Sequence, residues 1–359
     1  MAAVVPLAFG DIVRHHKDFY NELWAPAFLV VHGESAYATA SLGTPLPAVW
    51  LPMTIGGFAP LGLLSEELAT TVWFWFSVAS VAALVYLSVG ASPPLYVVVG
   101  TGLLAYFFPA TLNHFLLGQY SLQAALFLLL AANAIQHRRE WLAAFLLSLG
   151  SGKPQLAALA ALGLGLFVFG HAGPKGTFRF IAKAVAAALI LSLPVFLASP
   201  DWFNDYLAGW ARNPSWMHPS AFVLLRSRLG IAGIALWACL AAILVIFLVR
   251  LWRNHPANVA MYWTLAVTAL ITPYVWSWDF VIVLPLWVFA MAKADWRGQL
   301  LLLAAYLIGW AGMAAVQLFG EGGNVLYWWV PWWFVGAVLL AAMLARRAQR
   351  RARMGAVGG

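Results

Sequence analysis

The chain consists of long apolar runs separated by short polar segments, and from residue 68 onward the runs recur regularly. Because the middles of these runs lack charged residues, they predict membrane-spanning helices. Residues 140–152 are fewer than the ~20 that cross an average bilayer, so we expect them to combine with irregular backbone at 151–154. The eleven predicted spans are 68–90, 94–112, 119–136, 140–152, 154–171, 179–199, 230–250, 257–273, 276–292, 299–318 and 326–345.

Two of these apolar segments, 120–135 and 141–150, flank a short basic loop, HRRE at 137–140. Polar residues stand at the opposite ends of the segments, His114 and Gln119 on one and Lys153 and Gln155 on the other. If the two segments are antiparallel helices, the arginines lie at one face of the membrane. The other polar residues then meet near the second face.

Residues before the first span follow a different pattern. An apolar stub (1–10) is too short to span a membrane, and a polar, aromatic-rich segment follows at 11–43. Prolines and glycines interrupt the apolar residues 45–64, which argues against a plain spanning helix. We therefore expect short interfacial helices within 20–64. Either an upstream helix is missing from the start, or 45–64 crosses and the N-terminus is cytoplasmic.

Composition supports an all-α polytopic membrane protein, with 64% hydrophobic and 9% charged residues and a mean hydropathy of +0.85. Soluble domains carry roughly 25% charged residues. The single cysteine, Cys239, excludes an intramolecular disulfide and a cysteine-based metal site. The eight histidines show no metal-ligand spacing, and no phosphate-binding loop or dinucleotide motif occurs. No metal or cofactor is predicted.

The net charge of +8 is explained by topology rather than by nucleic-acid binding. Alternating the eleven spans places fourteen lysines and arginines on the face of the C-terminus and six on the other face, together with ten of the twelve carboxylates. The positive-inside rule makes the first face cytoplasmic. The predicted regions are an extracytoplasmic N-terminal loop (1–65), a membrane domain (66–345) with an outer loop at 200–229, and a basic cytoplasmic tail (346–359).

Ionisable residues at membrane depth are functional candidates, and here they gather at the outer ends of the spans. Asp18, beside Phe19 and Tyr20, is the leading candidate for a general base, because an apolar setting raises the proton affinity of a carboxylate. The alternative is a solvated acid paired with Lys17. Asp279 is a further candidate, or else a helix-capping acid.

Basic and aromatic residues on the same face could hold a phosphate and a sugar. Lys153 could bind a phosphate or extend to lipid headgroups, and Arg226 and Arg228 leave the same two alternatives open. Five tryptophans on this face could stack on a sugar ring or belong to the interfacial belt, namely Trp202, Trp210, Trp216, Trp276 and Trp278. His114 is isolated, so a structural role is favoured over metal ligation.

Several stretches together resemble the polyprenol-phosphate-mannose-dependent mannosyltransferases of glycosyltransferase family 87, in the membrane-embedded C superfamily of glycosyltransferases. The resemblance covers about residues 15–290, and GQ, an apolar run and KPQ in that order are its most specific part. The matching stretches are Asp18-Phe19-x-x-x-Leu23, HGESAY (32–37), PLPAVWLP (45–52), LLGQYSLQAALFLL (116–129), RREWLAAFLLSLGSGKPQLAAL (138–159) and TPYVWSWDFVIVLPL (272–286).

The resemblance implies an inverting transfer of a hexose, mannose first, from a polyprenyl phosphate to a lipid or glycan acceptor on the outer face of a prokaryotic plasma membrane. Asp18 takes the place of the catalytic acid in the family's first loop, and Lys153 that of its KP lysine. The implied substrate-binding residues are Tyr20, His114, Gln119, Lys153, Gln155, Arg226, Arg228, Trp276 and Asp279. The chain departs from the family in lacking a spanning helix before the first loop, and Asp279 stands near a position where some members carry histidine.

Two other classes of function remain open from the sequence. A transporter or lipid flippase usually shows internal repeats and polar groups at mid-membrane, and neither is evident in this chain. A non-catalytic membrane subunit is the third reading. Besides the donor and the acceptor, the only expected partners are membrane lipids.

Overall fold

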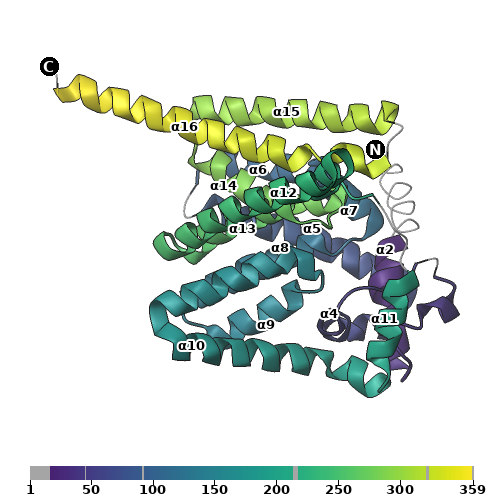
Figure 1. Ribbon diagram of the computed structural model, residues 1–359. Coiled ribbons are helices and arrows are strands. Elements are labelled where there is room, and N and C mark those ends of the chain that lie inside the picture. Colours follow the sequence, from purple (N-terminus) through teal and green to yellow (C-terminus); the bar gives the residue numbers. More distant parts are fainter. Residues whose placement is uncertain (1–16, 45, 91–92, 213–216, 321–322, 358–359) are drawn as a thin grey trace.

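The computed structural model describes residues 17–44, 46–90, 93–212, 217–320 and 323–357, and within them the side chains from 18 to 347. The described residues form helices and connecting turns, without strands (Figure 1). The predicted all-helical fold class is therefore confirmed. Residues 1–16, which include Arg14, and Pro45 lie outside the described residues.

The N-terminal part consists of short helices, as the density of prolines and glycines predicts. Residues 52–63 form two short helices rather than one span. Their place at a membrane interface stays a prediction. The bounds are α2 Lys17–Phe19, the π-helix η1 Tyr20–Trp24, α3 Ala25–Val31, the 3₁₀ helix η2 Thr39–Leu42, α4 Pro52–Gly57 and the 3₁₀ helix η3 Ala59–Leu63.

Longer helices make up the remainder of the molecule. Their bounds are α5 Glu66–Val89, α6 Leu95–Tyr106, α7 Pro109–Leu117, α8 Ser121–Gln136, α9 Glu140–Gly150, α10 Pro154–Ala198, α11 Trp202–Arg212, α12 Ala221–Asn254, α13 Ala257–Ile271, the 3₁₀ helix η4 Ser277–Val283, α14 Leu284–Lys293, α15 Trp296–Phe319, the 3₁₀ helix η5 Gly323–Tyr327 and α16 Val330–Val357.

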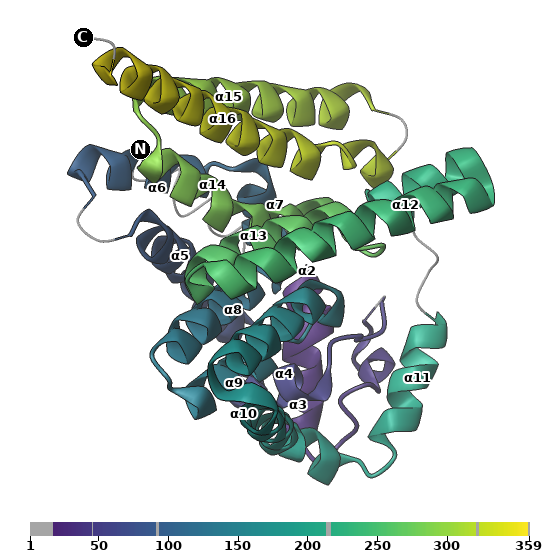
Figure 2. The same ribbon diagram turned by 60° about the vertical axis from the view of Figure 1, so that its left-hand side comes forward.

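Helices α8 and α13 form the centre of the core. Thirteen residues of α8 and twelve of α13 are buried, and the two helices pack against each other. A helix that is apolar on every side is buried on every side, which accounts for their place. Helices α15 and α16 pack together at one edge, away from the N-terminal helices (Figure 2).

Helices α8 and α9 form the predicted hairpin, and α10 packs beside them. The chain of α10 turns back at Gly173, where the backbone is not helical, so the two predicted segments 154–171 and 179–199 are its two limbs (Figure 1). Glu140 in the hairpin loop pairs with Lys183 of the second limb at 2.5 Å and with Arg179 at 3.6 Å. Two basic residues assigned to the same face as the hairpin loop, Arg179 and Lys183, therefore lie beside that loop.

Among the residues that the structure describes, five helices are long and apolar enough to cross a membrane, or six if the bent pair α6 and α7 counts as one span. The prediction of eleven spans stays a prediction. Helices α8, α9 and α13 have 16, 11 and 15 residues, fewer than the ~20 that an average bilayer requires. The chain is an integral membrane protein by this measure, and the side of its C-terminus is untested.

Candidate active site

Aromatic packing fixes the short continuous helix that α2 and η1 form, which carries Asp18 and Glu22. Phe19 and Leu23 are fully buried, and the Phe19 ring stacks on Trp73 with centroids 5.3 Å apart. Asp18 and Glu22 are four residues apart, so they lie on one face of the helix. That face lines a cavity.

Gln119 is placed by the turn between α7 and α8. Gly118 takes a left-handed conformation (φ 68°), which only glycine adopts without strain, and its carbonyl accepts a hydrogen bond from Trp73 Nε1 at 3.0 Å. The Gln119 amide nitrogen donates to Asp18 Oδ2, and its Oε1 accepts from Lys153 Nζ at 2.6 Å. Because a carboxylate only accepts and an ammonium only donates, this orientation of the amide satisfies both.

Lys153 follows a tight loop at the end of α9. Leu51 N–H donates to the Gly152 carbonyl at 3.3 Å, and the Tyr120 hydroxyl donates to the Leu149 carbonyl. A side chain on Gly152 would overlap Thr54. The close approach of this loop to α4 and α8 therefore directs Lys153 into the cavity.

Asp279 lies at the start of η4 and is fully buried. Its Oδ2 accepts from the Trp276 backbone N–H at 2.9 Å, so it does cap this helix. Its Oδ1 accepts from the Ser121 hydroxyl and forms an ion pair with Lys153 Nζ at 2.8 Å. The helix-cap interpretation of this residue thus describes a real contact, and its role in a substrate site stays a prediction.

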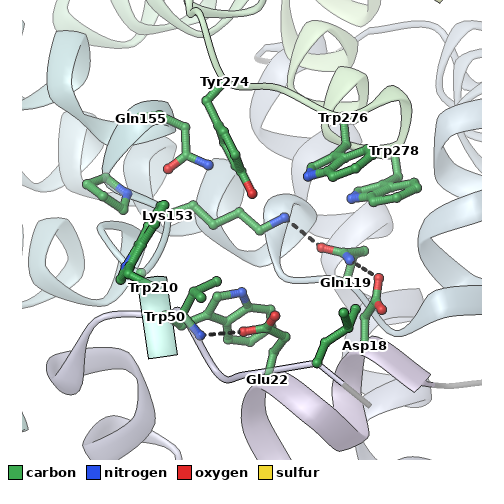
Figure 3. A pocket seen from close by; sticks show the side chains of 14 residues that line it. Asp18, Glu22, Trp50, Gln119, Lys153, Gln155, Trp210, Tyr274, Trp276 and Trp278 are labelled. Carbon is green, nitrogen blue, oxygen red and sulfur yellow. Dashed lines mark hydrogen bonds between the residues drawn. The ribbon is translucent and has the colours of Figure 1, made fainter. Parts of the chain in front are cut away.

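These elements enclose a cavity of about 200 Å³ (Figure 3). Lys153 extends across it, with Asp18 and Gln119 at one side, Glu22 beside Trp50, and the rings of Trp276 and Trp278 stacked with centroids 4.9 Å apart. Its lining residues are Asp18, Glu22, Leu46, Val49, Trp50, Gln119, Gly152, Lys153, Pro154, Gln155, Trp210, Tyr274, Trp276 and Trp278.

Both carboxyl groups on the short helix bind protons more tightly than usual. Burial raises the pKa of Asp18, and the Gln119 hydrogen bond and the charge of Lys153 only partly oppose this. Burial raises the pKa of Glu22 to about 8, against the lowering effect of its hydrogen bond from Val49 N–H. An ionised Asp18 is therefore a good proton acceptor, and Glu22 holds its proton at neutral pH.

The structure brings together five of the predicted site residues in the cavity lining: Asp18, Gln119, Lys153, Gln155 and Trp276. Asp279 touches this set through Lys153. All these residues were assigned to the same membrane face from the sequence, so their meeting agrees with that topology. Their roles in catalysis or binding stay predictions.

Four other predicted residues do not line the cavity. The Tyr20 hydroxyl donates to the Leu42 carbonyl at 3.1 Å, and His114 is fully buried at the end of α7. Arg226 and Arg228 are exposed on α12. Their contact with a phosphate stays a prediction, and it would have to occur outside this cavity.

Sequence reasoning assigned no site role to three residues of the cavity wall, Glu22, Trp50 and Tyr274. Trp210 and Trp278, two of the tryptophans predicted to stack on a sugar ring or to form the interfacial belt, also line the cavity. Trp216 lies outside the described residues. The spacing of Glu22 from Asp18, one helical turn, was a usable signal. Trp50 carried no such signal, because most of the twenty tryptophans in a membrane protein are first explained by the interfacial belt.

The chemistry available in the cavity is that of proton transfer and anion binding. The Trp278 Nε1 is buried and has no partner among the described residues, so it can donate to a bound oxygen. No group of three or more His, Cys, Asp or Glu suited to a metal ion occurs in the described part of the chain.

Comparison with known proteins gives the chain a family. Neither the curated proteins nor the solved structures include a significant match to it. The sequence model of glycosyltransferase family 87 matches residues 52–273, which is more than half of the 359 residues. That match includes Gln119 and Lys153 and lies between Asp18 and Asp279. The chain therefore belongs to glycosyltransferase family 87 and is a membrane glycosyltransferase.

Proposed function

We propose that the protein transfers a hexose, mannose being the first to test, from a polyprenyl phosphate to a hydroxyl group of a lipid or glycan acceptor at the outer face of the membrane. The observation that carries the proposal is the row of contacts from Asp18 through Gln119 and Lys153 to Asp279. It puts a carboxylate with a raised pKa and a lysine in one cavity.

Asp18 is the base in this proposal. It takes the proton of the acceptor hydroxyl while the hydroxyl oxygen bonds to the anomeric carbon of the donor sugar. The bond from that carbon to the phosphate oxygen breaks, and the lipid phosphate leaves with the electron pair. Attack opposite the leaving group inverts the anomeric carbon. General-base catalysis contributes about 10²–10⁴-fold.

Lys153 stabilises the leaving phosphate in the same proposal. Among the described residues its ammonium group has one carboxylate partner, Asp279, and two neutral acceptors, Gln119 Oε1 at 2.6 Å and Ser121 Oγ at 3.1 Å. Replacing a neutral acceptor by a phosphate oxygen strengthens the electrostatic interaction. A cation held where negative charge develops is a main source of rate enhancement.

Aromatic side chains supply the sugar-binding surface. Trp276 and Trp278 present a stacked pair of indoles at the cavity, and Trp50 and Tyr274 line other parts of the wall. Such rings offer apolar faces to the C–H groups of a hexose and N–H or O–H groups to its hydroxyls.

The test is transfer from labelled polyprenyl-phosphate hexoses by purified protein in liposomes. Asp18→Asn is expected to lower the rate at least about 100-fold, and the matched control Asp201→Asn, an exposed acid before α11, to leave it within about twofold of wild type. Undiminished transfer by Asp18→Asn would remove Asp18 from the mechanism. Absence of transfer by the wild type with all donors tried would contradict the proposed donor class.

The side of the membrane has its own test. Glu34 is exposed in the turn after α3, so Glu34→Cys in a Cys239→Ser background should react with an impermeant maleimide added to intact cells. A cysteine placed at Arg347 should react only after permeabilisation. The reverse result would place the cavity on the cytoplasmic side.

A further inference from the structure

The cavity holds more acidic groups than its one lysine can balance. Lys153 is paired with Asp279 at 2.8 Å, and among the lining residues that the structure describes it is the only lysine or arginine. Asp18 and Glu22 line the same cavity. If both were ionised, the site would carry two uncompensated negative charges and would repel an anionic sugar-phosphate donor.

Glu22 is held at the cavity wall by one strong contact. Its Oε2 accepts a hydrogen bond from the Val49 backbone N–H at 2.8 Å, and its carboxyl group lies beside Trp50 in Figure 3. The ionisable groups that face it are Asp18 on its own helix, Lys153 from the α9–α10 loop and Tyr37 from the turn before η2. Burial favours its neutral form, and the Asp18 charge adds to that preference.

The position of Glu22 relative to Asp18 indicates which substrate its carboxyl group contacts. In the proposed reaction Asp18 contacts the acceptor hydroxyl, and Glu22 lies one turn further along the same helix face. Trp50 lies beside it, and Trp210 lines the same cavity (Figure 3). A sugar or polyol stacked on these indoles would place one hydroxyl at Asp18 and another at Glu22.

We propose that Glu22 is an acceptor-binding residue that works as a neutral carboxylic acid, donating its O–H to a hydroxyl oxygen of a sugar or polyol acceptor beside Trp50 and Trp210. This inference rests on the proposed function. The contact aligns the acceptor so that its reacting hydroxyl reaches Asp18. No proton is transferred by Glu22 itself, and Asp18 remains the base.

The choice of variants separates this role from a structural one. Glu22→Gln keeps an acceptor for Val49 N–H and replaces the O–H donor by an amide N–H, so it mimics the neutral acid. Glu22→Ala removes both contacts. Glu34→Gln removes an exposed carboxylate from the same N-terminal segment and is the matched control.

The experiment measures transfer rates against acceptor and donor concentration from pH 6 to pH 10. Glu22→Ala is expected to raise the KM for the acceptor roughly tenfold or more, the effect of one lost hydrogen bond, with the donor KM within about twofold. Glu22→Gln should recover most of that loss. Wild-type activity should decline as pH rises through about 8, and this decline should be absent in Glu22→Gln and present in Glu34→Gln.

The outcomes distinguish this inference from the proposed function. If the wild type transfers no sugar, the proposed function fails. If the wild type is active, the inference alone is overturned by any of three results: Glu22→Gln is as impaired as Glu22→Ala, the donor KM rises in place of the acceptor KM, or Glu22→Gln keeps the alkaline decline. Thermal melting of each variant shows whether Glu22→Ala is folded, and Glu22→Gln decides the question if it is not.

Discussion

The ion pair between Lys153 and Asp279 gives a sharp test of the site. When one partner is removed by substitution, the two charged groups keep different hydrogen-bond partners, so the two single variants should lose different amounts of stability. The two side chains are 9% and 0% exposed and their charged atoms are 2.8 Å apart. At an effective dielectric constant of 20, two charges at this distance attract by about 6 kcal/mol. The cost of removing two ions from water, several kcal/mol each, offsets that attraction. The pair therefore adds little net stability, although breaking it is costly.

Asp279→Asn is expected to destabilise the protein by about 3–5 kcal/mol, the usual cost of leaving one buried ion without its partner. The stranded Lys153 would keep only neutral acceptors, namely Gln119 Oε1, Ser121 Oγ and the amide oxygen of the substituted side chain. Lys153→Met should cost less, about 1–3 kcal/mol, because the stranded Asp279 keeps two donors, the Ser121 hydroxyl and the Trp276 N–H. The double variant should cost less than the sum by about 1–3 kcal/mol.

Denaturant unfolding of the purified protein in one detergent measures all three variants. Glu140→Gln is the matched control, because it breaks a more exposed ion pair. The side chains of Glu140 and Lys183 are 21% and 18% exposed, so this variant should lose no more than about 1 kcal/mol of stability. Transfer activity should be lost in Lys153→Met and stay lost in the double variant. Additivity of the two single costs within about 0.5 kcal/mol would refute the reasoning.

Three further predictions concern single positions. Gly152→Ala should destabilise the Lys153 loop by about 1–3 kcal/mol and lower transfer, because the new methyl group overlaps Thr54, and Gly165→Ala, where the added group meets open space, is the control in the same melting assay. Between pH 4.5 and about 8 the folded protein keeps a Glu22 proton that the unfolded chain loses, so wild-type stability should fall by up to about 1.4 kcal/mol per pH unit. In Glu22→Gln this slope should be smaller, and an unchanged slope in denaturant titrations would contradict the raised pKa. Arg138→Gly should raise stability by up to about 1 kcal/mol without altering transfer, because Arg138 occupies a left-handed conformation (φ 58°) in the α8–α9 turn; a lower melting temperature would contradict this.

The hydrophobic pattern determined the all-helical class, the α8–α9 hairpin and the sorting of polar residues to its two ends. Gln119 and Lys153 could be found because they stand at the ends of apolar runs, where a helix period and a chain direction suffice to place them. Asp18 could be found because a carboxylate within an aromatic, apolar segment is unusual. These are local signals, and they also carry the family resemblance that the family match supports.

Which residues touch was decided by tertiary packing. Asp18 and Gln119 are 101 positions apart, and Ser121 and Asp279 are 158 apart. Hydropathy has no information at that separation, because it reports the burial of a residue and not its partner. The same limit explains why Glu22 was assigned no role from the sequence: only the packing of its helix on Trp73 turns it toward the cavity.

The two exposed arginines show that residues predicted to share a membrane face need not be in contact. Arg226 and Arg228 were grouped with Lys153 because all three were assigned to the outer face. In the structure the two arginines are exposed on α12 and do not line the cavity. A membrane face is a broad surface, so sharing it does not bring two residues together. The sequence predicted a shared face for these residues. The packing of the short N-terminal helices, the α9–α10 loop and η4 against one another decided which of them line the cavity.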